Sequence, residues 1–174
     1  VGERTKFRQV AKDLLRCLEQ MVLQVGFEKE AFDGLNNGRF RGFQLTAISK
    51  SLAIVSCKNA SKKVAESLLK IGLEYARPEF VVEAAKALMN YVCVSGESIS
   101  EYEIHRTQFE TYAQWRLLEE RAVTYFDWVT LFYTKKKALQ KENAVAARQY
   151  LAELEPYVGI IPSHSFHMAY FLLD

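Results

Sequence analysis

Apolar residues recur along this chain at three- and four-residue steps, the period of an amphipathic α-helix. The pattern is clearest over residues 65–93, where Arg77 and Pro78 interrupt it once. The two inward faces on either side of that break are marked by Leu68, Ile71 and Tyr75, and then by Ala84, Leu88 and Tyr91. Because a residue before proline is biased away from helical conformation, the pattern predicts a helical hairpin with a very short turn.

The same period predicts an all-α fold of about seven helices, and no segment alternates as a strand would. The predicted helices cover residues 4–25, 45–57, 60–76, 79–94, 98–141, 144–155 and 163–174. Asn59, Ser98 or Ser100, and Ser163 are the expected N-caps, and Gly96 the expected end of the fourth helix. Residues 98–141 are expected to form one long helix, with room for a bend near Arg116 to Arg121, because no Gly or Pro occurs from Glu97 to Glu155.

Residues 27–42 are predicted to be irregular, because five turn-forming residues gather there: Gly34, Asn36, Asn37, Gly38 and Gly42. We interpret this segment as a loop pinned to the core by its phenylalanines. Its mixture of Phe and Arg leaves single-stranded nucleic-acid binding as the alternative. A second, shorter turn is predicted at Lys141 to Asn143.

The composition fits one globular domain, with 49% hydrophobic and 25% charged residues in 174. The chain has no run of about 18 apolar residues, the length needed to span a membrane. Its charged N-terminal residues do not form a secretory signal. We therefore expect a cytoplasmic chain with no membrane partner. Because the sequence lacks an initiating Met, we also expect it to be part of a longer protein. Three widely spaced cysteines, Cys17, Cys57 and Cys93, are expected to be small buried hydrophobes.

Charge is distributed unevenly although the net charge is only +2. Residues 39–70 contain seven Lys or Arg and one Glu, a net charge of +6. Residues 97–127 contain seven acids and three Arg, a net charge of −4. A basic segment of this kind keeps nucleic acid as the second candidate partner.

Motifs for catalysis or cofactor binding do not occur in the sequence: it has no GxSxG, P-loop or GxGxxG. His164 and His167 share a helical face, but no Cys or carboxylate pattern completes a zinc site around them. We therefore expect no enzyme activity, no cofactor and no metal.

The hairpin resembles a tetratricopeptide repeat in its residue pattern. Leu68-x2-Ile71-Gly72-x2-Tyr75 is followed by Ala84-x3-Leu88, which is similar to the family's W-x2-L-G-x2-Y and A-x3-F. Leu68 stands where the family has Trp, and no Pro follows the second helix, so the resemblance implies an irregular antiparallel helical-hairpin repeat. It also implies a scaffold or regulatory module that binds a protein or peptide on a concave surface.

In tetratricopeptide-like arrays the first helix of each pair lines that concave surface. The candidate binding residues are therefore Lys62, Lys63, Lys70 and Tyr75 in one helix and Tyr102, His105 and Tyr112 in the long helix. Together with Glu101 and Gln108 they predict a groove with a basic wall, an acidic wall and tyrosine anchors, provided that Tyr102 and Tyr112 are not both enclosed. Self-association through the last helix is expected to use Phe166, Tyr170, Phe171 and Leu173.

Overall fold

A computed structural model describes residues 34–54, 56–96, 98–135 and 140–173 of the chain. These residues form α-helices and one 3-10 turn, and no strand occurs among them. The elements are α2 (Gly34–Ile54), α3 (Lys58–Glu74), α4 (Pro78–Ser95), α5 (Ile99–Lys135), α6 (Gln140–Leu154), η2 (Glu155–Tyr157) and α7 (His164–Leu173). The all-α prediction is confirmed. The helix predicted at residues 4–25 lies outside the described residues.

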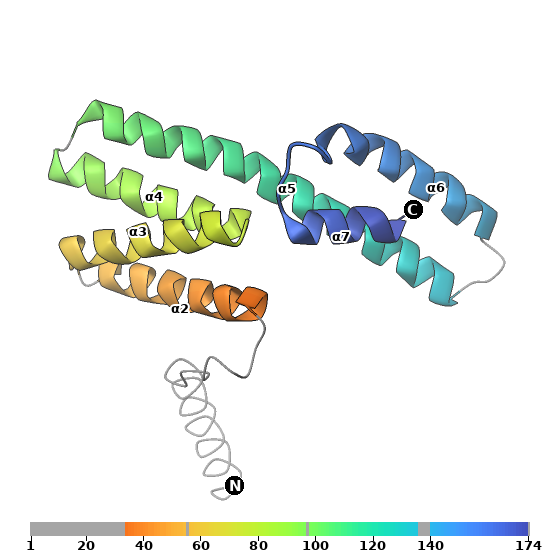
Figure 1. Cartoon of the computed structure of the whole chain (residues 1–174), viewed down its shortest axis with the longest axis horizontal. Helices are drawn as coiled ribbons and strands as arrows, with labels where there is room; N and C mark the ends of the chain where they lie inside the picture. Colours follow the sequence, from red (N-terminus) through yellow and green to blue (C-terminus); the bar gives the residue numbers. More distant parts are fainter. Residues whose placement is uncertain (1–33, 55, 97, 136–139, 174) are drawn as a thin grey trace, which may run out of the picture.

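Helices α2 to α5 run in alternating directions, and each packs against the next in the chain (Figure 1). Helix α2 also contacts α4, so α2, α3 and α4 all pack against one another. The C-terminal half of α5 extends beyond this stack and carries α6 and α7 (Figure 1). One long helix therefore joins two packed halves of the molecule.

The turn between α3 and α4 is as short as the sequence predicts. Arg77 N–H donates to the Gly72 carbonyl at 2.8 Å and Ala76 N–H donates to the Leu73 carbonyl at 3.4 Å. This bonding pattern is a Schellman motif, in which the residue after the helix adopts the left-handed conformation. Ala76 occupies that position with a φ of 48°, although glycine is the residue that usually does so.

Close approach between α3 and α4 depends on Gly72, the glycine of the repeat-like motif. The first core cluster forms beside it from Leu68, Ile71, Phe80 and Ala84. A Cβ at residue 72 would lie 2.9 Å from the backbone nitrogen of Val81, a distance that real Cβ atoms do not adopt. The small residue therefore sets the distance between the two helices.

The loop predicted at residues 27–42 is wrong where the structure describes it, because α2 begins at Gly34. Gly38 and Gly42 are buried inside this helix, facing other helices. Cβ atoms at these positions would lie 2.7 Å from the Tyr75 ring and 2.2 Å from the Phe80 ring. Here the glycines provide space for neighbouring aromatic rings, and turn chemistry is not their role.

Other predicted boundaries are confirmed or corrected in detail. Gly96 ends α4 with a φ of 71°, and Ser98 and Ser163 each accept a backbone N–H at the start of the following helix. Asn59 is not a cap, because α3 begins at Lys58 and its N-cap residue is Cys57. The turn predicted at residues 141–143 is also wrong, since α6 begins at Gln140.

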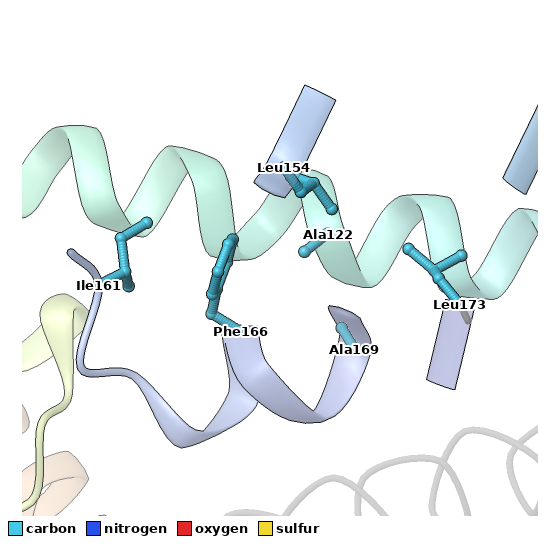
Figure 2. Close-up of a cluster of buried hydrophobic side chains, with 6 residues drawn as sticks. All are labelled: Ala122, Leu154, Ile161, Phe166, Ala169 and Leu173. Carbon is cyan, nitrogen blue, oxygen red and sulfur yellow. The ribbon is translucent and has the colours of Figure 1, made fainter. Parts of the chain in front are cut away.

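Helix α5 has 37 residues and is unbroken between Arg116 and Arg121, so the prediction of one long helix is confirmed. Its predicted end near residue 141 is wrong, because α5 ends at Lys135 and α6 begins at Gln140. The C-terminal half of α5 contributes Ala122 to the second core cluster, which Figure 2 shows between α5 and α7. The other members are Leu154, Ile161, Phe166, Ala169 and Leu173. Ala122 is fully buried, so the absence of a large side chain there lets the α7 residues approach the α5 backbone.

The C-terminal helix uses two of its apolar residues differently from the prediction. Phe166 and Leu173 are buried within the chain's own core, so they are not available for self-association. Phe171 is exposed, together with Met168 and Leu172 on the outer face of α7.

A polar cluster connects the two halves of the molecule where α7 begins. Arg77, from the α3–α4 turn, donates through Nη1 to the Ser165 hydroxyl at 2.9 Å. The Ser163 hydroxyl, which is fully buried, donates to Glu119 Oε2 of α5 at 2.8 Å. Burial raises the pKa of the Glu119 carboxyl, and the hydrogen bond from Ser163 opposes that rise.

We predict that Gly72→Ala lowers the free energy of unfolding. Overpacking costs about 1–3 kcal/mol, which exceeds the gain of up to about 1 kcal/mol from replacing glycine by alanine within a helix. Urea unfolding measures the difference. Gly159→Ala is the control, because no atom lies within 4 Å of a Cβ placed there. Equal stability of Gly72→Ala and the wild type would contradict the packing described for α3 and α4.

We also predict a pH dependence of stability that originates in Glu119. Its pKa in the folded state is raised, so the folded protein binds the proton more tightly than the unfolded chain. The free energy of unfolding should therefore fall as the pH rises from the ordinary carboxyl value of 4.5 through the raised pKa, and then level off.

Glu119→Gln should remove this decline, because the amide does not ionise and its oxygen still accepts from Ser163. Urea unfolding of both proteins across this pH range measures the decline. The exposed neighbour Glu120, replaced by Gln, is the matched control and should retain it. An identical pH profile for Glu119→Gln and the wild type would refute the assignment.

Candidate functional site

A hollow of about 390 Å³ opens between α3 and α5, with α4 as its floor. We call it the α3–α5 groove. Its lining consists of Lys62, Glu66, Leu69, Lys70 and Leu73 from α3, Leu88, Tyr91 and Val92 from α4, and Glu101 and His105 from α5. Volumes of this order are typical of ligand sites, which occupy roughly 300–1,000 Å³.

Helical spacing explains why these side chains meet. The α3 residues of the lining recur at three- and four-residue steps, so they share one face, and Ala65 and Leu68 on another face are buried. Glu101 and His105 are four residues apart and share a face of α5 in the same way. The groove is therefore built from single faces of two helices that flank α4.

The walls of the groove carry both signs of charge over an apolar floor. Lys62 and Lys70 provide positive charge, and Glu66 and Glu101 provide negative charge. The floor includes Leu88, which is 2% exposed, whereas Leu73 at the rim is 46% exposed. Leu73 therefore adds exposed apolar area beside the charged residues of the groove.

Tyr91 is the fixed aromatic residue of the groove. Its hydroxyl donates to Asn59 Oδ1 at 3.2 Å, and the Lys62 ammonium lies 4.7 Å from the ring centroid. A cation over a tyrosine face is attracted by the ring's negative quadrupole. On the opposite wall, His105 Nδ1 lies 3.1 Å from Gln108 Oε1. Both contacts restrict the positions of side chains that line the groove.

The structure brings together three of the seven predicted binding residues, namely Lys62, Lys70 and His105. Lys63 is exposed and lies outside the lining. Tyr75 packs against the first core cluster and beneath Gly38, so its ring belongs to the core and does not serve as an anchor in the groove.

Tyr102 and Tyr112 are half-buried, so neither is enclosed, but neither lines the groove. The Tyr112 ring packs against Trp115 with centroids 4.5 Å apart, and burial raises the pKa of its hydroxyl. These two tyrosines therefore lie on α5 outside the groove.

Sequence reasoning missed the apolar part of the site. Leu69 and Leu73 lie outside the buried face of α3, and Tyr91 was assigned to the core. A signal was present, because the apolar residues of α3 cover a wider arc than one packed neighbour requires. Two adjacent leucines at 68 and 69, followed by Leu73, indicate contacts on both sides of the helix.

Potential metal ligands do not gather among the described positions. No group of three or more His, Cys, Asp or Glu there could hold a metal ion. The rings of Phe166 and Phe171 flank His167. The buried-cysteine prediction is wrong for Cys57 and Cys93, which are exposed thiols, and Cys17 lies outside the described residues.

Within the part of the chain that the structure describes, no helix combines the length and apolarity needed to cross a membrane. Comparison of the sequence with family models and curated proteins, and of the structure with solved structures, finds no match. The groove itself is therefore the basis for assigning a function.

Proposed function

We propose that this chain is an irregular helical-hairpin repeat module, of the tetratricopeptide-like type, that binds a protein or peptide in the α3–α5 groove. Three features support the proposal. Consecutive helices alternate in direction, α3 and α5 flank α4 as the first helices of successive pairs would, and their facing residues surround one hollow. A scaffold or regulatory role in the cytoplasm fits such a module.

The observation that carries the proposal is the combination of an apolar floor with walls that carry both signs of charge. Leu73 and the half-buried Leu69 offer apolar contact area, which provides most of the affinity of a peptide interface. Lys70 and Glu101, from different helices, determine orientation and specificity more than affinity. The expected partner is an amphipathic helical segment, or a peptide that carries both acidic and basic residues beside apolar ones.

Nucleic acid is the competing partner, and the positions of the basic residues favour a peptide. Lys62 and Lys70 line the α3–α5 groove, whereas Lys50 and Lys58 line a different hollow. The basic residues of the +6 segment therefore lie at two different hollows. A polyanion is held best by cations that follow its backbone along one continuous track.

A displayed peptide library selected on the full chain tests the proposal. We expect the enriched peptides to combine apolar residues with charges of both signs. Leu73→Ala should weaken the binding of the synthesised peptides by about 1 kcal/mol, or about fivefold, because it removes an apolar contact. Fluorescence anisotropy measures the dissociation constants.

Two matched controls accompany this test. Leu117→Ala removes another exposed leucine, on α5 outside the groove, and should leave affinity unchanged. Lys70→Glu should alter affinity for the charged peptides more than Lys63→Glu, although both change the net charge equally. Peptides that bind Leu73→Ala and Lys70→Glu as tightly as the wild type would place the binding surface elsewhere.

A salt titration separates the two partner classes. For generic RNA or DNA, the logarithm of the binding constant falls steeply and linearly with the logarithm of salt concentration, because binding releases counterions. We expect groove peptides to lose much less affinity over the same range, since their contacts are partly apolar. Binding to RNA or DNA with a steep salt dependence, and no enriched peptide, would support the alternative.

A further inference from the structure

A second hollow of about 390 Å³ lies between α2 and α4, over α3. We call it the α2–α4 hollow, and its lining includes Lys50, Lys58, Ser61, Leu68, Lys86 and Asn90. Tyr91 lines this hollow as well as the α3–α5 groove, so its side chain lies between the two. The two hollows otherwise use different faces of α3 and α4.

The α2–α4 hollow is more positive than the groove. Lys50 is neutralised by Glu83, with its ammonium 2.8 Å from the carboxylate. Lys58 and Lys86 form no ion pair with any residue that the structure describes. Two uncompensated ammonium groups, one on α3 and one on α4, therefore border the hollow.

The remaining lining can hold the rest of a ligand. Ala53, Ala87 and Val94, of which Val94 is 60% exposed, form the apolar lining of the hollow. Ser61 and Asn90 add polar groups at the same hollow, although the Ser61 hydroxyl also lies 3.5 Å from the Ser49 carbonyl. Cations, polar groups and apolar side chains within one three-walled space are the features of a site for an anionic small molecule.

We infer that the α2–α4 hollow binds a small organic anion, whose phosphate or carboxylate group is held by Lys58 and Lys86 and whose apolar body lies against the apolar lining. Lysine is an effective point charge for a phosphate or carboxylate oxygen. The volume matches a small molecule, and the pairing of Lys50 with Glu83 leaves Lys58 and Lys86 as the uncompensated cations of the lining. This site is separate from the proposed peptide groove and does not depend on it.

Nuclear magnetic resonance of the isotopically labelled full chain tests the inference, with phenyl phosphate and benzoate as anionic probes and phenol as the neutral control. We expect saturable shifts, for at least one anion, of amides around the hollow such as those of Lys58, Ser61 and Asn90. The stronger of the two anions identifies the charged group that the site prefers. Phenol should bind at least about tenfold more weakly, because it lacks the charge.

Charge-matched double variants give the control. Lys58→Gln with Lys86→Gln should weaken the preferred anion at least about tenfold, since it removes both charged contacts. Lys63→Gln with Lys70→Gln removes the same charge outside the hollow and should leave the dissociation constant within about twofold. All four lysines are exposed, so circular dichroism should show unchanged folding for both variants.

Several results would overturn the inference. These are equal weakening by the two double variants, shifts that map away from the hollow, or phenol binding as tightly as the anions. Absence of saturable shifts with either anion up to about 10 mM would do so as well. Binding of an acidic peptide or of RNA at this face, without binding of the small anions, would likewise assign the surface to a macromolecule.

Discussion

Both halves of the molecule depend on one constraint: the same helix, α5, packs against α4 in one half and against α6 and α7 in the other. At 37 residues it is about 55 Å long, and its two ends serve different neighbours. The N-terminal half covers α4 and provides the Glu101 wall of the α3–α5 groove. The C-terminal half holds α6 and α7 around Ala122 (Figure 2). Because the two cores are joined by one rigid helix and by the Arg77–Ser165 and Ser163–Glu119 hydrogen bonds, a break in α5 would disturb the groove and the C-terminal core together.

Local chemistry made much of the fold predictable from the sequence. Helical periodicity located α3, α4 and α5, and the Arg77–Pro78 break, Gly96 and Ser163 act in turns and caps as their chemistry suggests. Prediction failed where a residue's role depends on a distant partner. Gly38 and Gly42 are turn formers by composition, yet Tyr75 and Phe80 occupy the space that their missing side chains leave. No pattern within residues 34–42 contains that information, because the rings belong to the next hairpin.

In the candidate site, too, local spacing predicted some residues, whereas others depend on long-range packing. Lys62, Lys70 and His105 could be placed from periodicity and from the alternation of helices, since both depend on spacing along the chain. Leu73 and Tyr91 could not, because whether an apolar residue is covered depends on how far neighbouring helices are offset. Tyr75 shows the reverse error: its position within the repeat-like pattern suggested a partner contact, but the glycines of α2 let its ring pack into the core.

The alternation of helices also explains why the two hollows differ in chemistry. A helix packed between two neighbours has two remaining faces, one on each side of the helical stack, and different residues occupy them. Helix α3 contributes Lys62, Glu66 and Lys70 to the α3–α5 groove, where both signs of charge meet. It contributes Lys58 to the α2–α4 hollow, where α4 adds Lys86 and Glu83 already pairs with Lys50. A net count over residues 39–70 merges these faces into one basic segment. The fold divides that charge, so the mixed surface suits a peptide and the positive one suits a small anion.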